Sequence, residues 1–457
     1  MVQYDLIVLG GGSGSTLAQR AGKKGLKTAL VEMGALGGTC ANRGCIPSKF
    51  LLQHAVVAET IRNAGQFHIH AKLTGIDSSK IFADMHSYID GSDENIGASL
   101  GRNVHLYRTR GEFLGPHTLR VNGDIIRAPR LVIATGLRPV RPEGIGPTVP
   151  YLVSDDIFVL KQAPKSMVIV GGGYIACEMS QFFLGMGTRT TLIERGRLLL
   201  KNEDLDVQKA FQTKFSRRID LRTETALQSV SYRSGRFHLR LKHAKKSGFE
   251  KMSADCLLYA IGRQPNTEGF AKAGFALDAH GFVKVNTHLE TNHRGVYALG
   301  DVNGRALFTH AANAQRKYLE QRILDGCTAP IDHGPMPHAI FTDPEIAAVG
   351  ESEQSLRARG AKFIKAIVRY SEVAKGRAMR ETAGLAKLLA APSGEILGFH
   401  IVGPDASILL HQVIPVIRFK NHVASLTKFI TIHPSLSELV VKTAQRALDK
   451  LADRKRS

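Results

Sequence analysis

Two cysteines near the N-terminus have a spacing that suits redox chemistry. Cys40 and Cys45 lie in the segment GGTCANRGCIPSK, separated by four residues, beside a glycine pair and just ahead of a proline. Taken alone, such a pair is compatible with a structural bridge, a metal fragment or unpaired core thiols. No companion CxxC or suitable His/Cys cluster in the sequence supplies the remaining ligands of a zinc site, so we predict no metal. With only five cysteines, the chain suits a reducing compartment, where a deliberate disulfide is usually catalytic.

The residues that follow the second cysteine favour a reactive thiolate. The segment CIPSKFLLQHAVVAE predicts a helix that starts near Cys45, with Pro47 close to its first turn. The positive end of a helix dipole stabilises a thiolate at such a position. The local sequence therefore supports a nucleophilic or redox role for this thiol.

A histidine and a glutamate near the C-terminus could manage the proton of a thiol. The segment TIHPSLSE places His433 five residues before Glu438, and Pro434 fixes the local turn. A thiol needs a base with a pKa near the working pH to become a nucleophile. A carboxylate on the other ring nitrogen fixes the tautomer of the histidine and raises its basicity. In isolation the same spacing is also compatible with a structural role.

The N-terminus carries a dinucleotide-binding pattern. The segment YDLIVLGGGSGSTLAQRAGKKGLKTALVE predicts a buried strand, a glycine-rich turn, a helix and a second strand that ends in Glu32. Gly10 permits a tight turn, and Gly12 lets the backbone approach a pyrophosphate at the helix N-terminus. Ser15 stands where a third glycine is usual. Glu32 can accept hydrogen bonds from ribose hydroxyls.

A second copy of the pattern lies in SMVIVGGGYIACEMSQFFLGMGTRTTLIERG. Its loop is Gly171-x-Gly173-x-x-Ala176, and Glu194 ends its second strand. Two such units imply two bound dinucleotides.

The other segments complete an α/β architecture with two Rossmann-like domains and a C-terminal α+β domain. A hairpin is predicted at Asn122-Gly123, and TNHRGVYALGDVNG predicts a strand that ends at Gly300-Asp301. From about Met336 the pattern changes to paired strands around a Pro-Ser-Gly turn, followed by long helical patterns. One of these, ASILLHQVIPVIRFKNHVASL, predicts a single helix over 406–426.

Composition bounds the setting of the protein. The chain has 457 residues, 43% of them hydrophobic, enough for two or three packed domains. The first residues show no signal-peptide pattern, and no apolar run is long enough to span a membrane, so we predict a cytoplasmic protein. A net charge of +21 would attract nucleic acid, anionic surfaces or acidic proteins. No zinc-finger or RNP-type signature points to nucleic acid.

Taken together, these motifs resemble the class I pyridine nucleotide-disulfide oxidoreductases over essentially the whole chain. The cysteine motif, both nucleotide loops, ATGLRP, AIGRQPN, YALGD and HPSLSE occur in the order and approximate spacing of that family. The resemblance implies a homodimeric flavoprotein with four segments: FAD-binding residues 1–147 and 267–334, NAD(P)-binding residues 148–266, and an interface domain over 335–457.

The resemblance also implies roles for individual residues. Cys40 and Cys45 would form a redox-active disulfide, with Cys45 against the flavin and Cys40 as the interchange thiol. Lys49, paired with Glu178, would stabilise reduced flavin. His433, oriented by Glu438, would act as acid and base across the dimer interface. The cofactor-binding positions carried over from the family motifs are Gly10, Gly12, Glu32, Lys49, Thr135, Gly136 and Asp301 for FAD, and Gly171, Gly173, Tyr174, Glu194 and Gly262 for the nicotinamide dinucleotide.

Substrate is predicted from details within the motifs. Three motifs look most like the dihydrolipoamide dehydrogenase branch: GGTC…GCIPSK, FTDPEIAAVG and HPSLSE. We therefore expect the substrate to be dihydrolipoamide or a lipoyl-bearing protein, and an acidic lipoyl-bearing protein is a candidate partner. The mercuric-ion branch carries a C-terminal cysteine pair, which this chain lacks. Ser48 stands where glutathione reductases usually have lysine. Ala41 and Arg43 replace the usual apolar residues between the cysteines, and Arg43 suggests a different or more acidic substrate.

Two further choices stay open in the sequence. Glu194 would bond the ribose 2′-hydroxyl of NAD and repel the 2′-phosphate of NADP, whereas Arg195 and Arg197 could hold that phosphate, so we predict NAD with NADP as the alternative. The alternatives to a lipoamide enzyme are a reductase of a low-molecular-weight disulfide, of the glutathione or mycothiol type, and a flavin-bearing protein that only binds through its basic surface.

Overall fold

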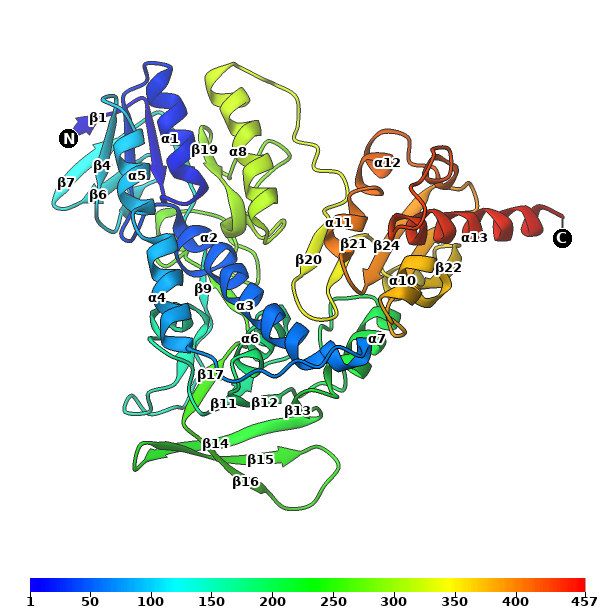
Figure 1. The fold of residues 1–457 in the computed structure, drawn as a ribbon. Coiled ribbons are helices and arrows are strands. Elements are labelled where there is room, and N and C mark those ends of the chain that lie inside the picture. The colour runs from blue at the N-terminus through cyan, green and yellow to red at the C-terminus, as the bar shows by residue number, and fades with distance from the viewer. Residues whose placement is uncertain (457) are drawn as a thin grey trace.

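A parallel five-stranded sheet built around the first glycine-rich turn anchors the N-terminal part of the computed structural model, which describes residues 1–456 (Figure 1). Its strand order is β19-β8-β2-β3-β4. The three inner strands, β8, β2 and β3, are almost fully buried, as expected for a sheet covered on both faces. The elements are β2 (Leu6–Leu9), α1 (Ser13–Lys23), β3 (Thr28–Val31), β4 (Val104–Tyr107), β8 (Arg130–Ile133) and β19 (Val296–Ala298).

The second glycine-rich turn builds an equivalent sheet. Its strand order is β10-β17-β11-β12-β13, and all its neighbours pair in parallel. Both predicted βαβ units are therefore confirmed. The elements are β10 (Leu152–Val153), β11 (Ser166–Val170), α6 (Tyr174–Gly185), β12 (Arg189–Ile193), α7 (Leu205–Phe215), β13 (Asp220–Arg222) and β17 (Cys256–Tyr259).

Smaller sheets with mainly antiparallel pairing accompany the two parallel ones. The predicted hairpin turn is present, with Asn122 at φ 46° and Gly123 at φ 86°, the left-handed pair that a tight hairpin requires. Two short strands, β9 (Leu137–Pro139) and β18 (Arg263–Pro265), pair where the chain passes between the parallel sheets. The remaining strands are β1 (Val2–Gln3), β5 (Glu112–Gly115), β6 (Thr118–Val121) and β7 (Asp124–Arg127), and a meander of β14 (Thr225–Arg233), β15 (Arg236–His243) and β16 (Glu250–Ala254).

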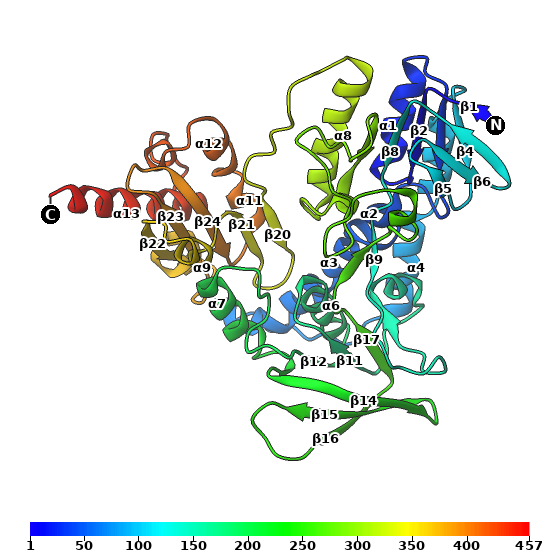
Figure 2. The same cartoon turned by 180° about the vertical axis from the view of Figure 1, so that it is seen from behind.

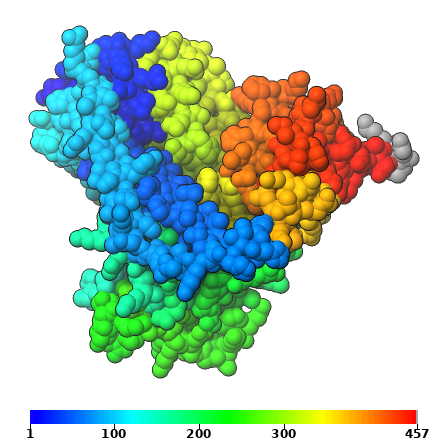
Figure 3. All heavy atoms as spheres, viewed as in Figure 1, coloured from blue at the N-terminus to red at the C-terminus, as the bar shows by residue number. Residues whose placement is uncertain are grey.

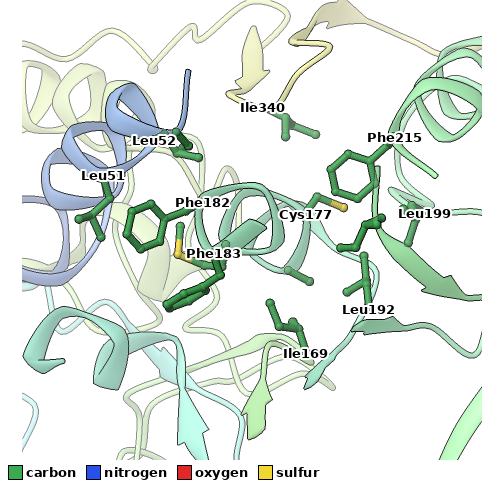
Figure 4. Close-up of a cluster of buried hydrophobic side chains, with 14 of the residues drawn as sticks. Leu51, Leu52, Ile169, Cys177, Phe182, Phe183, Leu192, Leu199, Phe215 and Ile340 are labelled. Carbon is green, nitrogen blue, oxygen red and sulfur yellow. The ribbon is translucent and has the colours of Figure 1, made fainter. Parts of the chain in front are cut away.

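A long helix, α3 (Cys45–Asn63), joins the two parallel sheets by packing across α6 (Figure 1). The contact is close because Gly185 has no side chain: a Cβ there would lie 2.6 Å from that of Ala55. Phe182, Phe183 and Leu51 are buried at this crossing (Figure 4). The other helices of this part are α2 (Gly38–Arg43), α4 (Ser78–Ile89), α5 (Ser92–Ser99) and α8 (Thr309–Leu324).

The C-terminal part forms a lobe beside the rest of the molecule (Figure 3). Its antiparallel sheet has the order β20-β21-β24-β23-β22 and is covered by α13 (Ser437–Arg456), which continues outward to the C-terminal end (Figure 2). The strands and short helices are β20 (His338–Ile340), β21 (Ile346–Gly350), α9 (Glu353–Ala358), β22 (Ile364–Arg369), α10 (Ala374–Ala378), β23 (Leu385–Ala390) and β24 (Ile396–Val402).

One predicted helix of this lobe is wrong. The segment 406–426 is not continuous but divides into α11 (Ala406–Leu410), α12 (Ile414–Phe419) and a 3₁₀ turn over Val423–Leu426. Pro415 explains the first break, because proline has no N–H to donate and its ring clashes with the carbonyl four residues earlier. Proline is tolerated at the start of α12, where no intrahelical partner is needed.

Candidate functional site

One cavity of about 2530 Å³ runs between the parallel sheets and reaches both glycine-rich turns and both N-terminal cysteines. This position, outside the carboxyl ends of parallel strands, is where α/β folds bind ligands. The predicted site residues that line it are Gly12, Glu32, Cys40, Cys45, Lys49, Thr135, Gly136, Gly171, Gly173, Tyr174, Glu178, Glu194, Gly262 and Asp301. Gly10, His433 and Glu438 are not among the lining residues.

The first glycine-rich turn is shaped for close backbone approach. Gly10 has φ 116°, and a Cβ there would collide with the carbonyl oxygen of Ala134, so its role is to form the turn. Gly12 and Gly38 face each other: a Cβ on Gly38 would lie 2.8 Å from the Cα of Gly12. The side-chain-free cradle at the start of α1 fits a pyrophosphate. These residues fit the adenine-dinucleotide half of FAD.

Glu32 holds the same turn in place. Its carboxylate accepts the N–H groups of Gly11 at 2.5 Å and Gly34 at 2.7 Å. The acid therefore lies at the end of β3 beside the cradle, as the sequence pattern predicted. Arg43 lies on this side as well, since a Cβ on Gly34 would be 3.4 Å from Oε1 of Glu32 and 3.7 Å from Nη2 of Arg43. Arg43 therefore lies beside Gly34, and it also lines the cavity that contains both cysteines.

The second turn repeats this design. Gly171 has φ 128°, and a Cβ there would collide with the carbonyl oxygen of Ala260. Glu194 accepts the N–H of Gly196 at 2.6 Å and lies against Gly172, whose Cβ would be 2.5 Å from Oε2 of the glutamate. Arg195 is exposed and lines the cavity beside this carboxylate. A nicotinamide dinucleotide fits this half of the cavity on the same grounds.

The two cysteines stand at the junction of α2 and α3 as free thiols with different chemistry. The thiol of Cys40 donates to Cys45, which lowers the pKa of Cys45 to about 5 and raises that of Cys40 above its ordinary value. The hydroxyl of Thr309 and the charge of Lys49 also lower the pKa of Cys45, against the opposing effect of burial. The pair is therefore a thiol beside a thiolate, with the thiolate on Cys45.

An ion pair across the α3–α6 crossing lies next to the thiolate. Lys49 Nζ lies 3.0 and 2.9 Å from the two carboxylate oxygens of Glu178, which is buried. The N–H of Phe341 donates to the same carboxylate at 3.0 Å, and the ammonium stands 4.7 Å from the centre of the Phe341 ring. A cation fixed by three contacts suits the stabilisation of negative charge on a reduced flavin.

Asp301 lies at the end of the last strand of the first parallel sheet. Burial raises its pKa to about 6, although the charge of Arg263 opposes that effect. Arg263 itself pairs with Asp155 at 2.9 Å and donates to the carbonyl of Leu137. A polar acid facing the cavity at this point fits a hydroxyl-bearing chain such as the ribityl part of FAD.

His433 and Glu438 contact each other as expected but stand apart from the cysteines. Nδ1 of His433 lies 2.8 Å from Oε1 of Glu438, and this contact lowers the pKa of the glutamate. The His433 side chain is 71% exposed. Ile430 and Ile432, just before it, are also exposed. His433 is therefore exposed to solvent next to two exposed isoleucines, which we call the apolar strip.

Three residues that contact the site were missed in the sequence. Thr309 lies 3.4 Å from the sulfur of Cys45, Phe341 contacts the ion pair, and Arg263 pairs near Asp301. Arg263 belongs to AIGRQPN, so its motif was visible although its role was not. Thr309 and Phe341 reach the site only through the fold. Across residues 1–456, no group of three His, Cys, Asp or Glu side chains is placed to hold a metal.

Comparison with known proteins identifies the family. Residues 4–317 match the family described as pyridine nucleotide-disulphide oxidoreductase, and residues 336–444 match its dimerisation domain. The chain belongs to this family. The predicted family and fold class are therefore confirmed, as is the use of FAD and a nicotinamide dinucleotide, and the protein is a flavoprotein oxidoreductase with a dimerisation domain.

Individual relatives differ in substrate. The chain is 35% identical to a mycothione reductase of Mycobacterium tuberculosis (strain ATCC 25618 / H37Rv), over 96% of this chain and 98% of that protein. It is 31% identical to a dihydrolipoyl dehydrogenase of Chlamydia muridarum, over 98% and 97%. It is 30% identical to a glutathione reductase of Burkholderia cepacia, over 97% and 99%.

A solved structure extends the likeness to the fold. The HOCl-induced flavoprotein disulfide reductase RclA from Escherichia coli, in its Cu(II) complex, superposes with a TM-score of 0.85 at 25% identity, over 97% of this chain and 99% of that one. Within residues 1–456, no helix has the length and apolar character to cross a membrane.

Proposed function

We propose that this chain transfers electrons between NAD(H) and a dithiol–disulfide substrate through Cys40 and Cys45, and that the substrate is a dihydrolipoamide or a lipoyl-bearing protein. The observation that carries the proposal is the polarised cysteine pair in a cavity that also reaches both nucleotide turns and the Lys49–Glu178 pair. A binding protein would have no need of such a pair.

The chemistry divides between the bound cofactor and the residues of this chain. FAD, when bound, exchanges an electron pair between the nicotinamide and the cysteines. In the oxidised enzyme the thiolate of a dithiol substrate attacks the sulfur of Cys40, the Cys40–Cys45 bond breaks, and Cys45 leaves as a thiolate. A thiol of low pKa is a good leaving group, which fits Cys45.

The second half of the exchange completes the balance. The remaining substrate thiolate attacks its own sulfur that is bound to Cys40, so the substrate becomes a cyclic disulfide and Cys40 leaves as a thiolate that takes a proton. The substrate has lost two electrons and two protons. The cysteine pair has gained the two electrons and one proton, on Cys40, and the second proton passes to the base that activated the substrate thiol. Lys49, held by Glu178, balances negative charge near the cysteines.

A homodimer would supply the acid and base. His433 stands outside the cavity of its own chain, oriented by Glu438 and flanked by exposed Ile430 and Ile432. Burying this apolar strip against a second copy would carry His433 toward the Cys40 of that copy. We propose that each site uses a histidine of the opposite subunit to take and return the substrate proton.

The proposed cofactor is NAD rather than NADP. Glu194 keeps a carboxylate at the edge of the second turn, and only Arg195 of the two neighbouring arginines lines the cavity. A carboxylate at this point accepts a bond from the 2′-hydroxyl and repels a 2′-phosphate. The four-segment division at residues 147, 266 and 334, the carried-over cofactor positions and the cytoplasmic location belong to the same proposal.

Mycothiol disulfide is the second candidate substrate, favoured by the 35% identity to a mycothione reductase over nearly the whole chain. The lipoyl candidate is supported by the motifs around Cys40. A dihydrolipoyl dehydrogenase also matches over 98% of the chain.

A kinetic panel separates these candidates. The dimeric, flavin-loaded enzyme would be assayed with lipoamide, a lipoyl protein, glutathione disulfide and mycothiol disulfide, each with NADH and NADPH. The lipoyl proposal requires kcat/KM for a lipoyl substrate with NADH to exceed the others by at least about tenfold, which corresponds to about 1.4 kcal/mol of transition-state discrimination. A larger value for mycothiol disulfide would replace it with the second candidate.

A further inference from the structure

Within residues 1–456, Thr309 is the hydroxyl-bearing residue whose side chain the structure shows bonded to the sulfur of Cys45. Its Oγ1 lies 3.4 Å from the sulfur of Cys45, and it is also a side-chain hydrogen-bond partner of Cys40. The residue is far from both in sequence, and it enters the cavity because it is the first residue of α8, a helix of 16 residues.

The position of Thr309 adds a second favourable effect. The first N–H groups of a helix have no intrahelical acceptors, and they create a positive potential at that end. The N–H of Ala312 bonds back to the carbonyl of Phe308, so the N–H groups of the three residues before Ala312 have no acceptor within α8. A hydroxyl held at this end can turn its proton toward a sulfur without moving the backbone.

The other charged or titratable groups near the thiolate come from four elements. Cys40 on α2 donates to it and Lys49 on α3 attracts it. Tyr174 at the start of α6 and Asp301 after β19 also interact electrostatically with Cys45. Ionised Asp301 would disfavour the thiolate, so the donors must offset that repulsion. Among the groups that act on Cys45 in residues 1–456, Thr309 is the uncharged hydrogen-bond partner that α8 supplies.

We propose that Thr309 is a positioning residue whose hydroxyl donates a hydrogen bond to the Cys45 thiolate and so keeps the negative charge on Cys45 after the disulfide is reduced. This inference rests on the proposed function, because the bond matters for catalysis only if Cys40 and Cys45 exchange electrons with a substrate. No proton is transferred: the hydroxyl keeps its hydrogen, and the bond weakens when Cys45 returns to the disulfide.

The test measures the thiolate directly. In a flavin-loaded Cys40→Ser background, Cys45 is the single thiol of the pair, and its rate of alkylation by iodoacetamide is followed against pH by mass spectrometry of its peptide. Thiolate reacts and thiol does not, so the midpoint of the profile reports the pKa of Cys45. The comparison includes Thr309→Val, which keeps the shape and removes the donor, and Thr309→Ser, which keeps the donor.

We expect Thr309→Val to raise the midpoint by about one pH unit, a tenfold loss of thiolate at low pH, as for a lost bond to a charged group. Thr309→Ser should restore the original midpoint. A matched control is Thr60→Val on the exposed far end of α3, where the hydroxyl bonds only the carbonyl of Val56. That substitution should leave the midpoint unchanged.

The outcomes separate this inference from the proposed function. An unchanged midpoint in Thr309→Val, or a serine variant that behaves like the valine variant, overturns the role of Thr309. If Thr309→Val loses flavin, Thr309→Ala removes the same hydroxyl and is measured instead. Alkylation needs neither nicotinamide nor disulfide substrate, so an enzyme inactive with the whole kinetic panel would refute the proposed function while the midpoints still decide the role of Thr309.

Discussion

At the scale of single residues, identical side chains have different chemistry because their neighbours differ. Cys45 receives a bond from Cys40, a second from Thr309 and the attraction of Lys49, whereas Cys40 bonds to a neighbouring thiolate. Cys177, which is fully buried beside acidic groups, has its pKa raised instead. Only the thiol with donors is prepared to leave a disulfide as a thiolate.

Asp301 provides a prediction about pH and stability. Its pKa is near 4 in an unfolded chain and about 6 in the folded protein, so the folded state binds the proton more tightly. The resulting stability is present below pH 4 and is lost as pH rises through 6. Asp301→Asn removes this loss. The measurement is the free energy of unfolding in urea of the flavin-free protein. The value for the variant minus the value for the wild type should be larger at pH 7 than at pH 4, by up to about 3 kcal/mol.

The control for Asp301 is Asp124→Asn, a change at an exposed aspartate of β7. It should leave the pH dependence of the wild type intact. If Asp301→Asn shows the same pH dependence as that control, folding does not raise the pKa of Asp301.

At the scale of elements, the α3–α6 crossing positions the residues that we propose for catalysis, because α3 carries Cys45 and Lys49 and α6 carries Glu178. Gly185 allows the crossing: a Cβ there would be 2.9 Å from Cα of Ala55, a backbone atom that cannot move aside alone. Gly185→Val should therefore destabilise the protein by about 1–3 kcal/mol and separate the ion pair.

Thermal unfolding with bound flavin and the kcat of disulfide turnover would measure the effect of Gly185→Val, and both should fall. Gly65→Val is the matched control, since a Cβ on Gly65 meets nothing within 4 Å. Equal behaviour of the two variants would mean that the crossing does not depend on the glycine.

The second βαβ unit leads to a prediction about cofactor choice. Glu194→Ala would remove the proposed ribose acceptor and the carboxylate proposed to repel a 2′-phosphate, while Arg195 stays in the cavity. The ratio of kcat/KM for NADPH to that for NADH should rise by at least about tenfold. A wild-type enzyme that already prefers NADPH strongly would show that the arginine dominates and that the choice of NAD is wrong.

The elements also show what could be predicted from the sequence. Both glycine turns and the Asn122-Gly123 hairpin are local patterns, in which a few adjacent residues determine the backbone, and all are present. The helix over 406–426 was wrong because the apolar periodicity outweighed Pro415 in the prediction. The contacts of Thr309 and Phe341 depend on long-range packing, for which a single sequence holds no local signal.

At the scale of the whole molecule, part of the net charge of +21 is concentrated on the meander of β14, β15 and β16. Arg240 on β15 lies directly opposite Lys251 on β16, and both are exposed. Within residues 1–456 neither forms an ion pair with an acid. Facing like charges are destabilising in a sheet, so this surface contributes an uncompensated positive field.

This field predicts a salt dependence. If the substrate is an acidic lipoyl-bearing protein, kcat/KM should fall steeply as salt rises from low concentration to about 0.1 M, where screening acts over about 10 Å. Free lipoamide is uncharged and should give a flat line. Both would be measured on the dimeric, flavin-loaded enzyme. Parallel lines for the two substrates would mean that the positive charge has another purpose.

The most direct test of the redox cysteine pair is the absorption spectrum of the flavin-loaded protein during anaerobic addition of NADH. The wild type and a Cys327→Ser control should develop a long-wavelength charge-transfer band, because the Cys45 thiolate forms beside oxidised flavin once the disulfide has been reduced. Cys45→Ser should keep its flavin, accept electrons from NADH without that band, and lose disulfide turnover. A Cys45→Ser variant that keeps full disulfide reductase activity, or a wild type whose flavin is reduced with no such band, would contradict the account.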